Sequence, residues 1–129
     1  MILGMRTDAP EAHVVIVKNN GNVDDFEWHA HRTLARDLLK MIKERLESAQ
    51  ADWPDLKGIV LFEGPGSFTG LRIGGTVANT IAHAQKIPIV GTRGESWLQE
   101  GVKKLQENMD DKFVLPFYGA EANITKPRK

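Results

Sequence analysis

The sequence contains no cysteine, and this absence excludes several kinds of protein at once. A scaffold held by disulfides, a thiolate nucleophile and a zinc site with cysteine ligands all require that side chain. The four histidines do not compensate, because they show none of the spacings typical of a metal site. His29 and His31 alternate, but two ligands without a third hold a metal poorly. We therefore expect no metal and no cofactor.

An excess of charge is also missing, since Lys+Arg and Asp+Glu both number 17. A domain that grips a nucleic-acid backbone by itself usually carries a basic excess, so a large direct nucleic-acid footprint is not expected. No apolar run approaches the roughly 20 residues of a membrane span, and no signal peptide is evident. The chain of 129 residues is expected to be one cytoplasmic domain without membrane attachment.

Hydrophobic patterning predicts alternating strands and helices along most of the chain. Leu34, Leu38, Ile42 and Leu46 recur every four residues, which is typical of an amphipathic helix. The predicted strands lie at 2–5, 13–17, 23–29, 58–62, 87–90 and 113–115, and the predicted helices at 33–48, 68–85 and about 95–108. Three antiparallel strands followed by βαβ units give an α/β fold, a mixed sheet of about five strands with helices packed on it. This order is that of a single ribonuclease-H-like lobe, the half-unit of actin-like (ASKHA) ATPases.

The most distinctive segment is rich in glycine and lies between the strand at 58–62 and the next helix. Glycines here permit a tight turn and close approach of another group, and Ser67 is a natural N-cap for the helix. A helix N-terminus with free N–H groups can hold an anion. The segment lacks the Gly-Lys-Ser/Thr ending of a P-loop, however, and Gly70 follows Gly64-x-Gly66 one residue too late for a dinucleotide fingerprint. Phosphate binding and a simple strand-to-helix turn both stay open.

The helix predicted at 68–85 has a ridge that is nearly bare of side chains. Its small residues, Gly70, Gly74, Ala78 and Ala82, recur every four positions. Glycine inside a helix costs about 0.5–1 kcal/mol relative to alanine, and close approach of another backbone is the usual compensation. The approaching element is either a helix of the same chain or a helix of another subunit.

Eleven consecutive residues of this region resemble a family hallmark. Residues 64–74 read GPGSFTGLRIG, which is similar to the signature of the TsaB (YeaZ) proteins, and weaker similarity runs through residues 1–100. The resemblance implies a TsaB-like N-terminal lobe at 1–110, and a remnant of the start of a second lobe with a C-terminal tail at 111–129. The residues of the motif loop are Gly64, Pro65, Gly66, Ser67, Phe68, Thr69 and Arg72.

The resemblance also implies a function. TsaB proteins are paralogues of TsaD, the ligase that transfers a threonylcarbamoyl group to an adenosine of tRNA, and they lack its metal and catalytic residues. A non-catalytic scaffold subunit is therefore expected, bound to a TsaD-type ligase, with a TsaE-type ATPase completing the complex and tRNA contacted indirectly. The helices at 33–48 and 68–85 would form the interface, through Leu38, Ile42, Gly70, Gly74, Ala78 and Ala82.

Three departures from the family pattern leave alternatives open. Arg6 stands where family members carry an aspartate, and an arginine cannot ligate Mg²⁺. Leu34 replaces a histidine, and residues 114–121 match the start of a second lobe poorly. One alternative is a small ATPase or phosphate-binding protein that uses the loop Gly64–Thr69. The other is a self-associating homodimer, joined through the same helices and without the family role.

Overall fold

The computed structural model describes residues 1–119, apart from the side chain of His31. Residues 120–129, the last part of the remnant and tail expected at 111–129, lie outside the described residues. Five strands form one sheet in the order β3-β2-β1-β4-β5. Their bounds are Ile2–Arg6 for β1, Glu11–Val17 for β2, Val23–His29 for β3, Gly58–Phe62 for β4 and Ile89–Thr92 for β5.

The pairing of the strands is mixed. β1 pairs antiparallel with β2, and β2 pairs antiparallel with β3. β1 also pairs with β4, and β4 with β5, both in parallel. The predicted α/β fold with a mixed sheet of five strands is therefore confirmed. β5, predicted at 87–90, begins two residues later at Ile89, because Pro88 stands just before the first paired residue.

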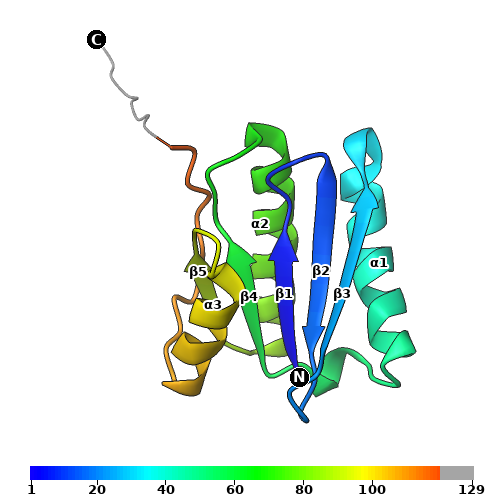
Figure 1. Cartoon of the computed structure of the whole chain (residues 1–129), viewed down its shortest axis with the longest axis vertical. Coiled ribbons are helices and arrows are strands. Elements are labelled where there is room, and N and C mark those ends of the chain that lie inside the picture. The colour runs from blue at the N-terminus through cyan, green and yellow to red at the C-terminus, as the bar shows by residue number, and fades with distance from the viewer. Residues whose placement is uncertain (120–129) are drawn as a thin grey trace.

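Three α-helices cover the two faces of the sheet (Figure 1). They are α1 at Leu34–Ser48, α2 at Phe68–Gln85 and α3 at Trp97–Gln106. α1 and α2 lie side by side on one face, and α3 lies on the other. The main core is between the sheet and the first two helices, and a smaller one, built around Val60, Phe62 and Trp97, lies under α3. None of the helices in residues 1–119 combines the length and apolarity that a membrane crossing requires.

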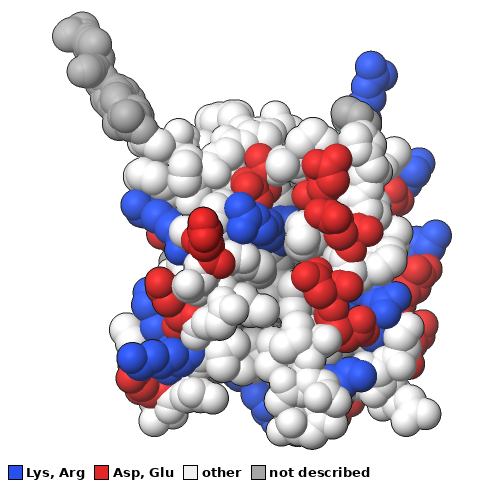
Figure 2. All heavy atoms as spheres, in the orientation of Figure 1, with Lys and Arg blue, Asp and Glu red and all other residues white. Residues whose placement is uncertain are grey.

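One part of the sheet has no helix over it. α3 covers β4 and β5, and the hairpin β2–β3 is left open on that side. Its open face carries acidic side chains, which gather over the hairpin in Figure 2. His13 lies among them, with Nε2 2.6 Å from Glu27 and Nδ1 3.3 Å from Asp25. This polar face explains why β3 alternates between exposed and half-buried residues.

The segment after α3 runs back along α2 and the edge strand β5. The strand predicted at 113–115 is wrong, because these residues form no ladder with another strand. Instead, the side chain of Asn79 acts as a pairing partner: Nδ2 donates to the carbonyl of Val114 at 2.9 Å, and Oδ1 accepts from its N–H at 2.9 Å. Val114 is buried in the main core. The chain around Val114 therefore packs against α2.

Two aspartates of the same segment cap the free edge of β5. Asp110 accepts a hydrogen bond from the N–H of Ile89 at 3.1 Å, and Asp111 accepts one from the N–H of Gly91 at 2.9 Å. Burial by itself raises the pKa of Asp110, but the N–H donors of Ile89 and Lys112 and the Lys112 ammonium lower that pKa below its ordinary 3.8. The carboxylates replace a neighbouring strand and protect the edge from pairing with another chain.

Replacing Asn79 by alanine is expected to lower the free energy of unfolding by about 1–3 kcal/mol, because a buried N–H and a buried carbonyl of Val114 lose their partners. Urea denaturation followed by circular dichroism measures this. The matched control is Thr80→Ala, since Thr80 is exposed and its hydroxyl bonds only within the helix, to Thr76. A change of about 0.5 kcal/mol or less is expected there. Equal effects in the two variants would contradict this role for Asn79.

Candidate partner-binding groove

The glycine-rich loop packs against its own chain. The side-chain oxygen of Ser67 accepts a hydrogen bond from the N–H of Gly70 at 3.3 Å, as expected of an N-cap, and the N–H of Ser67 donates to the carbonyl of Asp8 at 2.8 Å. A side chain at Gly66 would collide with Asp8, and one at Gly64 would collide with the carbonyl of Phe117. The glycines therefore allow other parts of this chain to pack closely against the loop. A tight strand-to-helix turn accounts for these glycines without a bound phosphate.

The small-residue ridge of α2 also faces inward. Thr7, which follows β1, is buried against it and donates from Oγ1 to the carbonyl of Gly70 at 2.8 Å. A side chain at Gly74 would collide with the same hydroxyl. Ala78 and Ala82 are buried in the main core. In the described residues the close neighbour of this ridge is the loop after β1 of the same chain, and its contact with another subunit stays a prediction.

The interface residues expected on α1 are also buried within this chain. Leu38 and Ile42 are completely buried in the main core, where the apolar stripe of α1 meets the sheet. A stripe that repeats every four residues marks the face that a helix buries, and here the sheet buries it. On the stripe of α1 next to the buried one, Ala35 and Leu39 are exposed and can be reached by a partner.

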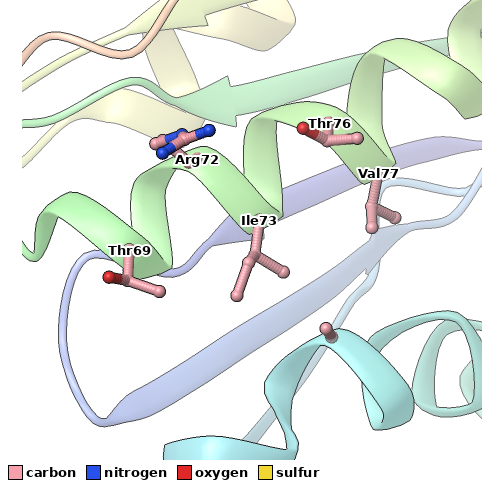
Figure 3. A pocket seen from close by; sticks show the side chains of 6 residues that line it. Thr69, Arg72, Ile73, Thr76 and Val77 are labelled. Carbon is pink, nitrogen blue, oxygen red and sulfur yellow. The ribbon is translucent and has the colours of Figure 1, made fainter.

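Between the outward sides of α1 and α2 lies an open groove of about 290 Å³. It is lined by Ala35 of α1 and by five residues of α2: Thr69, Arg72, Ile73, Thr76 and Val77. Figure 3 shows Ile73 and Val77 pointing from α2 toward α1, while Arg72 lies on the opposite side of the helix. Ile73 and Val77 are half-buried and pack against the edge of the main core. The floor of the groove is thus apolar and its α2 rim carries hydroxyls and a cation.

A second hollow, of about 340 Å³, continues from the N-terminal ends of these helices. Thr69 and Ile73 line both hollows, and the second one extends to Pro10 and Ala30 beside the loop after β1. The sequence patterns do not single out Ala35. A signal for Ala35 exists, because it lies one position after the buried Leu34 and so borders the core stripe.

Two ion pairs occupy the ends of the parallel strands, where α/β folds usually bind ligands. At the end of β1, Nε of Arg6 lies 2.8 Å from Asp8, and its guanidinium carbon lies 3.8 Å from the ring centroid of Phe62. Beyond β4 and β5, Nε of Arg93 lies 2.7 Å from Glu63. Residues 1–119 contain no group of three histidines and carboxylates placed to hold a metal ion. The charged side chains at these strand ends are therefore already paired with each other.

Comparison with known proteins connects this geometry to a family. Residues 28–118 match the family model of TsaD, tRNA N6-adenosine threonylcarbamoyltransferase. Curated relatives with that name include proteins of Bacillus anthracis, 29% identical over 82% of this chain and 36% of the relative, and of Listeria monocytogenes, 30% identical over 70% of this chain and 31% of the relative. The chain thus spans about a third of the length of these relatives.

Solved structures share the fold. YeaZ from Pseudomonas aeruginosa superposes with a TM-score of 0.69 at 24% identity, over 83% of this chain and 49% of that one. A second structure, described as similar to peptidase YEAZ from the same organism, gives 0.69 at 24% identity over 82% and 48%. The ribonuclease-H-like fold class is confirmed by this likeness. Because the family model covers most of the chain, this protein belongs to the TsaD family, tRNA N6-adenosine threonylcarbamoyltransferase.

Proposed function

We propose that the chain is a non-catalytic subunit, of the TsaB (YeaZ) kind, which docks onto a TsaD-type ligase and supports threonylcarbamoyl-adenosine (t6A) modification of tRNA. The observation that carries this proposal is the open apolar groove between α1 and α2. One wall of the groove is α2, which contains most of the family hallmark, and Leu39, one helical turn after the lining residue Ala35 of α1, is exposed. Exposed apolar surface with a polar rim is typical of a protein-binding site.

The ends of the parallel strands support the non-catalytic part of the proposal. Arg6 holds its guanidinium over Phe62 and pairs with Asp8, which places a cation where a nucleotide's metal would need carboxylates. The loop Gly64–Thr69 is filled by its own chain. The small-ATPase alternative therefore finds no support in this loop. A TsaE-type ATPase as third subunit, and a cytoplasmic location, complete the proposal.

The docking test uses this chain and the TsaD-type protein of the same source, mixed and analysed by size-exclusion chromatography with light scattering. A heterodimer is expected. Replacing Ala35 by arginine should weaken it at least about tenfold, because a long charged side chain would fill the apolar floor of the groove. Gln99→Arg adds the same side chain to an exposed position of α3 and should leave docking unchanged.

Two results would count against the proposal. Equal affinity of the wild type and Ala35→Arg for the ligase would place the interface outside the groove. A chain that never binds the ligase but forms a homodimer sensitive to Ala35→Arg would favour the self-association alternative, since a two-fold interface uses one self-complementary patch.

A further inference from the structure

The two edges of the sheet are finished differently. At the β5 edge, the carboxylates of Asp110 and Asp111 accept hydrogen bonds from strand N–H groups and take the place of a neighbouring strand. At the opposite edge, β3 pairs with β2 on one side only (Figure 1). In the part of the chain that the structure describes, no other strand and no side chain bonds to the outer backbone groups of residues 23–28. Such a row of free N–H and C=O groups can accept an additional strand.

The open face of the sheet at this edge is acidic. Glu11, Asp25 and Glu27 lie on it, and their side chains are 51%, 57% and 52% exposed. Their ion-pair partners are His13 and His29. Even with both histidines protonated, three carboxylates leave a net negative charge on this face, which Figure 2 shows over the hairpin.

Two arginines near the hairpin are already paired with other carboxylates. Arg6 stands opposite His13 on β1, and its Nε lies 2.8 Å from Asp8. Arg45 of α1 lies on the other side of β3, where its Nη2 is 3.0 Å from Asp24. The negative charge of the open face therefore stays available to a partner.

A second copy of the same strand matches this edge poorly. If two copies of β3 paired antiparallel about a two-fold axis at Phe26, Asp25 of each copy would stand opposite Glu27 of the other. An axis at Asp25 or at Glu27 would place that residue opposite its own copy. Like charges directly opposite each other destabilise a strand pair. The charges of β3 therefore select against self-pairing and favour a strand with basic side chains.

The other face of β3 offers apolar contacts at the same edge. Phe26 and Trp28 alternate with the acidic residues, are half-buried, and stack with their ring centroids 5.9 Å apart. Trp28 also packs against the main core. Successive side chains of a strand point to opposite faces of a sheet. A strand added beside β3 would therefore present alternate side chains to carboxylates and to aromatic rings.

We propose that the edge of β3 binds an extended segment of a protein partner in which basic and apolar residues alternate, by adding that segment to the sheet as a further strand. Backbone hydrogen bonds hold the segment, and Asp25 and Glu27 select its basic side chains. None of the residues that line the groove between α1 and α2 belongs to β3. The inference therefore goes beyond the proposed function and gives the lobe a second binding surface.

The test uses the whole chain and labelled peptides of seven residues, the length of β3. One peptide alternates lysine with valine, and the other alternates glutamate with valine. Fluorescence anisotropy at low salt should show that the lysine peptide binds at least about tenfold more tightly, because unlike charges attract and like charges repel across the new strand pair. Hydrogen exchange should become slower at the β3 amides when this peptide is bound and stay unchanged at the β5 amides.

A charge reversal tests the two carboxylates of β3. Asp25→Lys combined with Glu27→Lys should reverse the preference, so that the glutamate peptide binds more tightly. The milder Asp25→Asn with Glu27→Gln should weaken binding of the lysine peptide, and it keeps the size of both side chains. Glu100→Lys with Glu107→Lys makes the same change in net charge at exposed positions in and just after α3 and should leave the preference unchanged. A peptide with its lysines in one block should bind more weakly than the alternating peptide.

Three results would overturn the inference: no binding of the lysine peptide by the wild type, the same preference in the wild type and the charge-reversed variant, or binding that leaves exchange of the β3 amides unchanged. Slower exchange of these amides at high protein concentration without peptide would assign the edge to a second copy of the chain, which also contradicts it. The ligase is absent from all of these measurements, so their failure would leave the proposed function untouched.

Discussion

Gly74→Leu is expected to lower the free energy of unfolding by about 3 kcal/mol or more and to do so without any partner present. Gly74 is buried, and an added Cβ would collide with the hydroxyl of Thr7. Thr7 is itself buried and bonded to the carbonyl of Gly70, so it cannot turn aside without losing that bond. Inserting extra methylenes into a packed site costs typically 1–3 kcal/mol and occasionally more. Urea denaturation of the isolated chain measures the effect.

A double-mutant cycle with Thr7→Ala isolates the cause. Removing the hydroxyl and methyl of Thr7 makes space, so the milder Gly74→Ala should destabilise the Thr7→Ala background less than it destabilises the wild type. Alanine also restores up to about 1 kcal/mol of helix propensity, which makes the cycle more informative than either single variant. If Gly74→Leu unfolds like the wild type and only ligase docking is lost, the small-residue ridge is an intersubunit surface after all.

The elements that sequence predicted best are those with one strong physical signal. The strand Gly58–Phe62 and the helix Phe68–Gln85 begin and end at the predicted residues. The strand is a continuous apolar run buried on both faces, and the helix has Ser67 to cap its start. The segment at 113–115 misled the prediction because an apolar run there is held by an asparagine side chain and by aspartates, and no local pattern reveals such a distant partner.

The sequence named the two helices that border the candidate groove, and partner binding there stays a prediction. The pair of helices that borders the groove was named from sequence, but the residues chosen on them face the core. Periodicity shows that a helix has an apolar stripe, and it cannot show whether the sheet or a partner covers it. Ile73 and Gly74 illustrate this: they are neighbours in sequence, yet one lines the groove and the other packs on Thr7. Which of the two residues is buried depends on how β1 and the following Thr7 pack under α2.

Two adjacent leucines of α1 are expected to behave in opposite ways. Leu38 is completely buried in the main core and Leu39 is 49% exposed. Leu38→Ala should lower the free energy of unfolding by about 2–5 kcal/mol, since it leaves a cavity in a packed core. Leu39→Ala should change it by no more than about 0.5 kcal/mol, as for most surface substitutions. Urea denaturation of both variants compares the same chemical change one residue apart.

The affinity for the ligase should rank the two variants in the opposite order from their stability. Leu39 follows the lining residue Ala35 by one helical turn, so we expect a partner seated in the groove to contact it. Its truncation is expected to weaken docking about fivefold or more, as the loss of an exposed apolar contact would. Leu38→Ala, measured at a temperature where it is folded, should dock with nearly wild-type affinity because its side chain never reaches the surface. If Leu38→Ala instead weakens docking while Leu39→Ala does not, the partner binds a rearranged α1, and the groove between α1 and α2 is not the interface.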